Sequence, residues 1–141
     1  MAEERVIPPA IFILADDDGE AMRRICHSLT SEWYFVPVWQ PERVVRFAKR
    51  FSARAVFIAD RIEYPRGGAA RLLARVVDEV GTPVVILAEL WEPKVRAKWK
   101  RMGATDCIPH PTRTRERMEL LRAKMQEFLL HGVSRDDPGA G

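Results

Sequence analysis

The 141-residue sequence has few cysteines and no long hydrophobic run. No apolar stretch approaches the ~20 residues that a membrane helix needs, which argues against a membrane protein. Cys26 and Cys107 fall in a predicted helix and a predicted strand, a placement that suits two free thiols rather than a disulfide framework. The histidines show no spacing typical of metal ligands. The N-terminal residues lack the basic and apolar segments of a secretory signal, so we expect a cytoplasmic protein.

The sequence also lacks both glycine-rich phosphate-binding motifs. Neither G-x-G-x-x-G after the first predicted strand nor G-x-x-x-x-G-K-[ST] occurs, so dinucleotide-binding and P-loop interpretations lose their main support. The net charge of +3 is too small to imply nucleic-acid binding by itself. Without an internal repeat or a second domain, the chain is predicted to divide into an N-terminal extension at 1–10, one domain at 11–132, and a flexible tail or linker at 133–141.

Apolar runs and helical patterns alternate along the predicted domain. The runs predict strands at 11–15, 33–39, 54–60, 84–88 and 106–111. The segments after them carry apolar residues at the spacing of one buried helix face, and the last predicted helix covers 112–130. These buried faces are expected to include Phe51, Val77 and Met102. Five such units predict an α/β fold of the flavodoxin-like, doubly wound (βα)5 type, a three-layer sandwich.

The order of the strands in this sheet is expected to be 2-1-3-4-5. Pro37 lies inside the second predicted strand, and proline cannot donate a hydrogen bond to a central ladder, so this strand is placed at an edge. The acids that end the first and third strands favour central positions for those two strands.

Acidic residues follow the first and third predicted strands. Asp16, Asp17 and Asp18 follow the first strand, and Asp60 ends the third. Ligands of open α/β sheets bind outside the carboxyl ends of the strands, so these acids are expected to form an oxygen-lined site of the kind that holds Mg²⁺. For Asp60 alone, a role in capping the following turn is the alternative.

Over residues 11–130 the chain resembles the receiver domain of bacterial two-component response regulators. The landmarks are Asp16, Asp17 and Asp18, Asp60, Gly68, the run 83–87, and the segments 103–106 and 109–111. The resemblance implies that Asp60 accepts a phosphoryl group. It also implies that Mg²⁺ is held by Asp60, by an acid pair, and by the backbone carbonyl of Ile62. The pair is either Asp16 with Asp17 or Asp17 with Asp18.

Three family positions carry other residues here. A Thr or Ser ends the fourth strand in the family, a Lys follows the fifth strand, and an aromatic residue precedes that Lys; this chain has Ala88, His110 and Cys107. A hydroxyl hydrogen bond to a charged group contributes about 1.5–3 kcal/mol, and the Lys supplies a positive charge. We therefore predict a pseudo-receiver that is not an enzyme and acts by docking, independently of phosphorylation or only weakly phosphorylated. A working phospho-acceptor is the alternative.

The resemblance further implies docking through the fourth helix, fifth strand and fifth helix. The basic residues expected on that face are Lys94, Lys98, Lys100, Arg101, Arg113 and Arg117. We expect a protein partner with an acidic surface, either a sensor kinase or a downstream effector, and a homodimer is a further option. Nucleic-acid binding through the basic fourth helix is a remote alternative, because no helix-turn-helix or aromatic platform accompanies it. Trp91 is either a lid over the core or an anchor for the partner.

Overall fold

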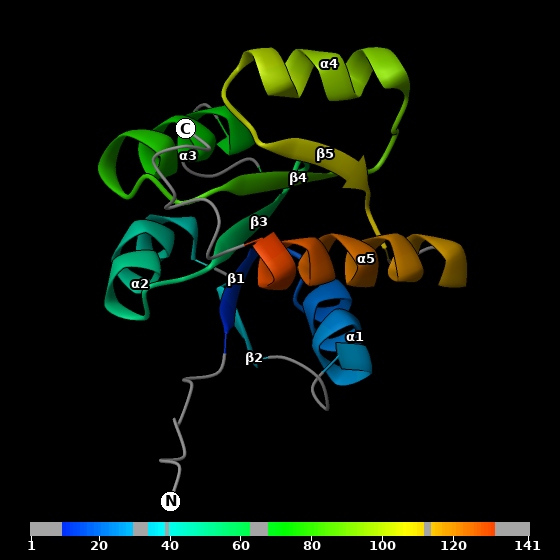
Figure 1. Ribbon diagram of the computed structural model, residues 1–141, viewed down its shortest axis with the longest axis horizontal. Helices are drawn as coiled ribbons and strands as arrows, with labels where there is room; N and C mark the ends of the chain where they lie inside the picture. The colour runs from blue at the N-terminus through cyan, green and yellow to red at the C-terminus, as the bar shows by residue number, and fades with distance from the viewer. Residues whose placement is uncertain (1–9, 30–33, 39, 63–67, 112–113, 132–141) are drawn as a thin grey trace, which may run out of the picture.

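The structure, a computed structural model, describes residues 10–29, 34–38, 40–62, 68–111 and 114–131. Strands and helices alternate through these residues (Figure 1). In chain order they are β1 (Ile11–Ala15), α1 (Gly19–Leu29), β2 (Tyr34–Val38), the 3-10 turn η1 (Pro41–Arg43), α2 (Val44–Arg50), β3 (Ala55–Ala59), α3 (Gly68–Glu79), β4 (Val84–Ala88), α4 (Pro93–Arg101), β5 (Asp106–Pro109) and α5 (Arg115–His131).

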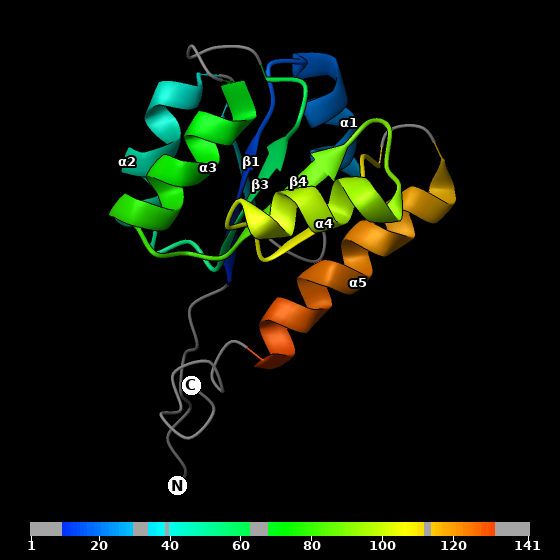
Figure 2. The same ribbon diagram turned by 90° about the horizontal axis from the view of Figure 1, so that it is seen from above.

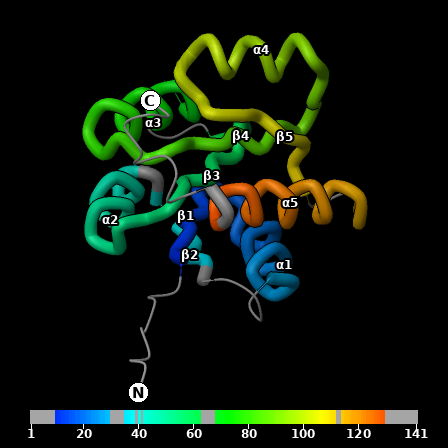
Figure 3. Tube along the Cα trace, in the orientation of Figure 1, coloured from blue at the N-terminus to red at the C-terminus, as the bar shows by residue number. Residues whose placement is uncertain are grey.

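The strands form one parallel sheet in the order β2-β1-β3-β4-β5, which confirms the predicted fold class and strand order. The tube in Figure 3 follows this order from β2 at one edge to β5 at the other. All five residues of β3 are buried, because β1 and β4 flank it and helices cover both of its faces. Burial on both faces explains why the sequence of β3 lacks polar alternation.

Helices cover the sheet on both faces and create two separate cores (Figures 1 and 2). On one face, buried residues of α2, α3 and α4 pack against the sheet. On the other face, α1 and α5 pack around Phe12 and Phe57, whose rings lie 5.9 Å apart. None of the helices that the structure describes combines the length and the apolar character needed to cross a membrane.

The second strand lies at an edge of the sheet, as Pro37 predicts. Pro37 pairs with Leu14 of β1, and no described strand pairs with its other side, so its missing N–H leaves no gap inside the ladder. The predicted strand includes one further residue at each end of β2. Trp33 and Trp39 lie outside the described residues.

Three side chains predicted to face the core are partly exposed. Phe51 is 37% exposed, and Val77 and Met102 are each 42% exposed. Phe51 and Met102 are the C-terminal caps of α2 and α4, where each helix leaves the sheet. Helical spacing alone does not show where a helix loses contact with the sheet. The predicted buried faces of α2 and α4 therefore extend past the last residues that contact it. The last helix also begins later than predicted, at Arg115.

Candidate functional site

The carboxyl ends of β1 and β3 bring predicted acids to one edge of the sheet. These strands pair in parallel with Ala15 opposite Ile58, so Asp16 and Asp60 both follow strands that end side by side. Asp16 is fully buried and Asp60 is half-buried, whereas Asp17 is exposed. The acid enclosed by the protein is therefore Asp16.

Asp18 stabilises the start of α1. Its Oδ1 accepts hydrogen bonds from the backbone N–H groups of Glu20 and Ala21, each at 3.1 Å. These N–H groups have no partner within the helix, so the carboxylate satisfies them and also interacts well with the positive end of the helix dipole. The N–H of Asp18 donates in turn to Asp16 Oδ1 at 3.0 Å. Asp18 thus couples the helix to the buried acid.

Arg61, directly after Asp60, contacts three carboxylates. Its Nε donates to Asp16 Oδ1 at 3.1 Å and its Nη2 donates to Asp16 Oδ2 at 3.0 Å, so the guanidinium binds this carboxylate through both oxygens. Nη1 lies 3.2 Å from Glu89 Oε2, and Nη2 lies 3.6 Å from Asp18 Oδ2. Arg61 was not among the site residues predicted from the sequence. The available signal was a cation placed immediately after the acid that ends a central strand.

His110 joins the same group of charges from the end of β5. Its side chain is fully buried, and Nε2 lies 3.1 Å from Asp16 Oδ2 and 3.2 Å from Arg61 Nη2. A single Nε2 donates to Asp16 when it carries a proton and accepts from Arg61 when it does not. Nδ1 lies 3.7 Å from Glu89 Oε2. We call Asp16, Asp18, Asp60, Arg61, Glu89 and His110 the acidic cluster.

The cluster shifts the pKa values of Asp16 and Asp60 in opposite directions. Burial by itself raises the pKa of Asp16, but hydrogen bonds from His110 and Arg61 outweigh it and hold the pKa below its ordinary value. Burial raises the pKa of Asp60, which accepts a hydrogen bond at 3.3 Å from the backbone N–H of Glu89. Asp16 is therefore the firmly ionised acid, and Asp60 is the more easily protonated one.

The residues present do not fit a resident Mg²⁺ in this arrangement. Arg61 and His110 engage both carboxylate oxygens of Asp16, which a metal would need as ligands. Within the described part of the chain, no group of three or more Asp, Glu, His or Cys side chains is arranged to hold a metal ion. Ile62, assigned by resemblance as a carbonyl ligand, has a buried side chain, and its N–H donates to the Ala59 carbonyl at 3.3 Å.

Solved structures share this arrangement of strands and helices. The receiver domain of a putative LuxO repressor protein from Vibrio parahaemolyticus superposes with a TM-score of 0.75 at 15% identity, covering 92% of this chain and 96% of that one. The chain has the receiver-domain fold. The receiver domain of an HD domain-containing protein from Pseudomonas fluorescens gives a TM-score of 0.75 at 18% identity, over 97% of this chain and 99% of that one.

A third receiver domain, that of the Francisella response regulator 1452, superposes with a TM-score of 0.72 at 16% identity over 86% of this chain and 96% of that one. No family model and no curated protein matches the sequence. These superpositions establish the receiver fold, but identities this low carry no residue roles. The chemistry of the site therefore follows from the side chains of this chain.

The three atypical positions lie on β4 and β5 or directly after them: Ala88 ends β4, Cys107 lies inside β5, and His110 follows β5. Ala88 is fully buried and offers a methyl group in place of a hydroxyl. The N–H of His110 donates to the Ala88 carbonyl at 2.9 Å, which holds the two strand ends together. Burial and the nearby Asp60 and Asp106 raise the pKa of Cys107 to about 12, so this thiol is not a nucleophile at neutral pH.

Trp91 lies over the core beside these positions. Its indole Nε1 donates to the Cys107 carbonyl at 2.8 Å, and its half-buried ring packs against the core cluster on the α2, α3 and α4 face. This placement supports the interpretation as a lid, because the polar end of the side chain is already satisfied within the protein.

The basic residues predicted for a docking face are exposed on α4 and less accessible on α5. Lys94, Lys98, Lys100 and Arg101 are exposed, while Trp99 between them is buried. Arg117 is half-buried, and its Nη1 donates to the His110 carbonyl at 3.3 Å, so it is less available to a partner. Arg113 lies outside the described residues.

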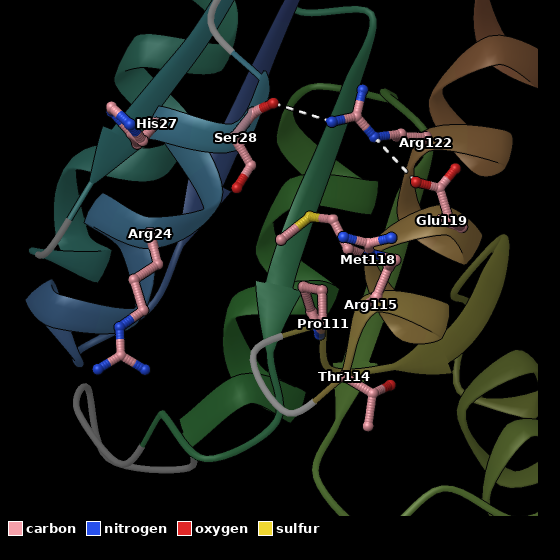
Figure 4. A pocket seen from close by; sticks show the side chains of 9 residues that line it. All are labelled: Arg24, His27, Ser28, Pro111, Thr114, Arg115, Met118, Glu119 and Arg122. Carbon is pink, nitrogen blue, oxygen red and sulfur yellow. Dashed lines mark hydrogen bonds and ion pairs between the residues drawn. The ribbon is translucent and has the colours of Figure 1, made fainter.

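A second basic surface lies in a groove between α1 and α5 (Figure 4). The groove has a volume of about 550 Å³ and is lined by Arg24, His27, Ser28, Pro111, Thr114, Arg115, Met118, Glu119 and Arg122. Arg122 of α5 donates to the Ser28 carbonyl of α1 at 2.9 Å, which ties α5 to α1 across the groove, and it lies 3.5 Å from Glu119 of the same helix. This groove was not predicted from the sequence.

Proposed function

We propose that this chain is a receiver-like docking module whose action does not depend on phosphoryl transfer to Asp60. The observation that carries the proposal is the pairing of Arg61 with both oxygens of Asp16, the acid that a metal-dependent site would need free. The partner is a protein with an acidic surface, in the role of a sensor kinase or an effector. Two free cysteines suit a cytoplasmic setting.

The missing side chains support the same proposal on chemical grounds. Phosphoryl oxygens carry negative charge and need cations and hydrogen-bond donors around them. Ala88 offers no hydroxyl, and His110 is already within hydrogen-bonding distance of Asp16 and Arg61. Mg²⁺ has to compete with Arg61, so we expect it to bind the native chain only weakly.

Treatment with acetyl phosphate or beryllofluoride in the presence of Mg²⁺ tests the proposal. We expect slow or absent modification of Asp60 by intact mass, and no amide shifts spreading to α4 by NMR. The Asp60→Asn variant is the matched control, because it keeps the shape of the side chain but cannot form an acyl phosphate. Rapid, stoichiometric modification that is lost in Asp60→Asn contradicts the proposal and favours the phospho-accepting alternative.

One observation favours that alternative. Asp60 is only half-buried, and the one hydrogen bond described to its side chain comes from the backbone of Glu89, so the carboxylate is open to a phosphodonor. A phosphoryl group there would have Arg61 nearby as a cation, since its charge already acts on the pKa of Asp60.

The exposed lysines and arginine of α4 are the proposed docking surface. Lys98→Glu combined with Arg101→Glu should slow association with the partner and flatten its dependence on salt, since exposed charges are screened over about 8–10 Å. Arg71→Glu on α3 is the matched control, because Arg71 is also an exposed arginine on a helix. Lys98 lies 5.5 Å from the centre of the Trp99 ring, so circular dichroism should verify that the double variant folds.

The measurement has two stages. The immobilised wild-type chain captures candidate partners from an extract of the source cells, and association rates are then measured with the purified partner at several salt concentrations. Unchanged rates in the double variant contradict docking through α4. Arg24→Glu then tests the groove between α1 and α5, where Arg24 lines the wall formed by α1 (Figure 4). A steep loss of DNA affinity with salt would instead revive the nucleic-acid alternative.

A further inference from the structure

The acidic cluster carries its own balancing charge. Asp16, Asp18, Asp60 and Glu89 bring four carboxylates to one edge of the sheet, and the guanidinium of Arg61 lies within 4 Å of three of them. Its charge also acts on the fourth, Asp60. Carboxylates gathered at one edge repel one another unless a cation lies among them, so Arg61 supplies the positive charge that reduces this repulsion.

The geometry resembles metal chelation more than a surface ion pair. Asp16 is fully buried, and the side chain of Arg61 is 28% exposed, so the fork of the guanidinium reaches inward from the edge of the cluster. Asp16 Oδ1 accepts from Arg61 and from the N–H of Asp18, while Oδ2 lies within hydrogen-bonding distance of Arg61 and His110. Surface ion pairs contribute little, whereas a buried carboxylate held by a bidentate arginine is strongly stabilised in its charged form.

The alternative explanation is that Arg61 merely caps the end of β3. A cap would be satisfied by the backbone near Asp60, whereas every described hydrogen bond of the Arg61 side chain goes to a side chain of β1, β4 or β5 or of the residues directly after them. Arg61 therefore bridges three strand ends from a fourth, which is also what a shared metal ion does.

We propose that Arg61 is a tethered cation that takes the place of a divalent metal ion in the acidic cluster. Removing the guanidinium should end its hold on both oxygens of Asp16 and leave the four carboxylates without their shared cation, so that oxygen ligands of the kind that Mg²⁺ and Mn²⁺ prefer become available. The inference rests on the proposed function only in that both assume Asp60 does not need a metal. The test of the inference measures metal binding rather than docking or phosphorylation. The inference and the proposed function can therefore fail independently of each other.

The test uses Mn²⁺ as the probe and the Arg61→Ala variant of the full chain. Mn²⁺ broadens the amide NMR signals of nearby residues, so a titration reports both the affinity and the location of the ion. We expect Arg61→Ala to bind Mn²⁺ at least about tenfold more tightly than the wild type, with broadening centred on Asp16 and Asp60. Arg75→Ala is the matched control, because Arg75 pairs with Glu79 on the exposed side of α3, and its affinity should equal that of the wild type.

Two further variants show how a gain in Mn²⁺ affinity, or the absence of a gain, should be interpreted. Adding Asp16→Asn to Arg61→Ala should abolish the gain, because Asp16 is the acid that the guanidinium releases. If Arg61→Ala does not fold, Arg61→Gln removes the charge while keeping most of the volume and is titrated in its place. Equal Mn²⁺ affinity in the wild type and the folded Arg61 variant overturns the inference, as does a gain that survives Asp16→Asn.

A measurement on the wild-type chain provides an independent check. The Nε–H of Arg61 donates to the buried Asp16, so its NMR signal should exchange slowly with water and stay in place when Mg²⁺ is added. Asp16→Asn should speed that exchange. Fast exchange in the wild type, or displacement of the signal by low concentrations of Mg²⁺, means that the guanidinium does not hold the site.

Discussion

At the scale of single residues, three consecutive aspartates lie in three different environments. Asp16 is buried and paired with Arg61, Asp17 is exposed, and Asp18 caps α1. The backbone of one short loop accounts for the difference, because it turns from the end of β1 into the first turn of α1 over these residues. Three chemically identical side chains therefore contribute differently to stability because of their positions in the loop.

Replacing Asp18 should destabilise the protein, and replacing Asp17 should not. Asp18→Ala leaves two N–H groups at the start of α1 without their acceptor, which costs about 1 kcal/mol. Asp17→Ala changes an exposed side chain and should stay within about 0.5 kcal/mol of the wild type. Urea unfolding of the two variants measures both values. Equal losses would mean that the three acids act together rather than separately.

At the scale of secondary-structure elements, Asp106 fastens two helices to the sheet. It begins β5, and its Oδ1 accepts from Arg96 of α4 at 2.7 Å while its Oδ2 accepts from Lys124 of α5 at 2.6 Å. Burial raises the pKa of Asp106, but the bonds from Lys124 and Arg96 outweigh it, and the pKa lies below its ordinary value of 3.8. The carboxylate of Asp106 thus connects the proposed docking helix α4 to β5 and, through Lys124, to α5.

Asp106→Asn should destabilise the protein at neutral pH and less so in acid. The loss at pH 7 should be about 1–3 kcal/mol, because two cations lose a charged acceptor. A folded pKa below the unfolded value means that the contribution is complete above pH 3.8 and disappears as the pH falls through the folded pKa. Urea unfolding at pH 7 and near pH 3 should therefore show the two curves converging. Asp78→Asn, an exposed acid on α3, is the control.

At the scale of the whole molecule, the sheet separates two apolar cores and its central strands belong to both. Alternate residues of β3 enter the two cores: Val56 and Ile58 face α2 and α3, while Phe57 faces α1 and α5. β2 lies at the edge, and Phe35 and Val36 are only half-buried. Stability should therefore fall from the centre of the sheet towards β2.

Amide hydrogen exchange should reveal this gradient. The amides of Phe57 and Ile58 should exchange only on global unfolding, because both neighbouring strands and both helix layers must open to expose them. The amides of Phe35 and Val36 should exchange faster, through local opening of the edge strand. Native-state exchange followed by NMR at several denaturant concentrations separates the two classes. Equal exchange rates in β2 and β3 would contradict the prediction.

Much of the fold could be predicted because short stretches of the sequence show which residues are buried. β1 and β4 have the predicted bounds, since unbroken apolar runs that end at a charged residue leave little choice of strand ends. The edge position of β2 followed from Pro37, whose missing N–H is a property of one residue. The acids Asp16 and Asp60 follow two strands that pair in parallel, and parallel strands end at one edge of a sheet.

The sequence by itself determined which segments are strands and helices and which acids reach the edge of the sheet, because these depend on periodicity and side-chain type. Only the tertiary structure decided how the charges pair. Arg61 binds Asp16 across 45 positions of the chain, and His110 reaches it across 94. Charged groups select partners through distances of a few ångströms, and such distances between remote segments exist only after the sheet has assembled and the helices have packed on it.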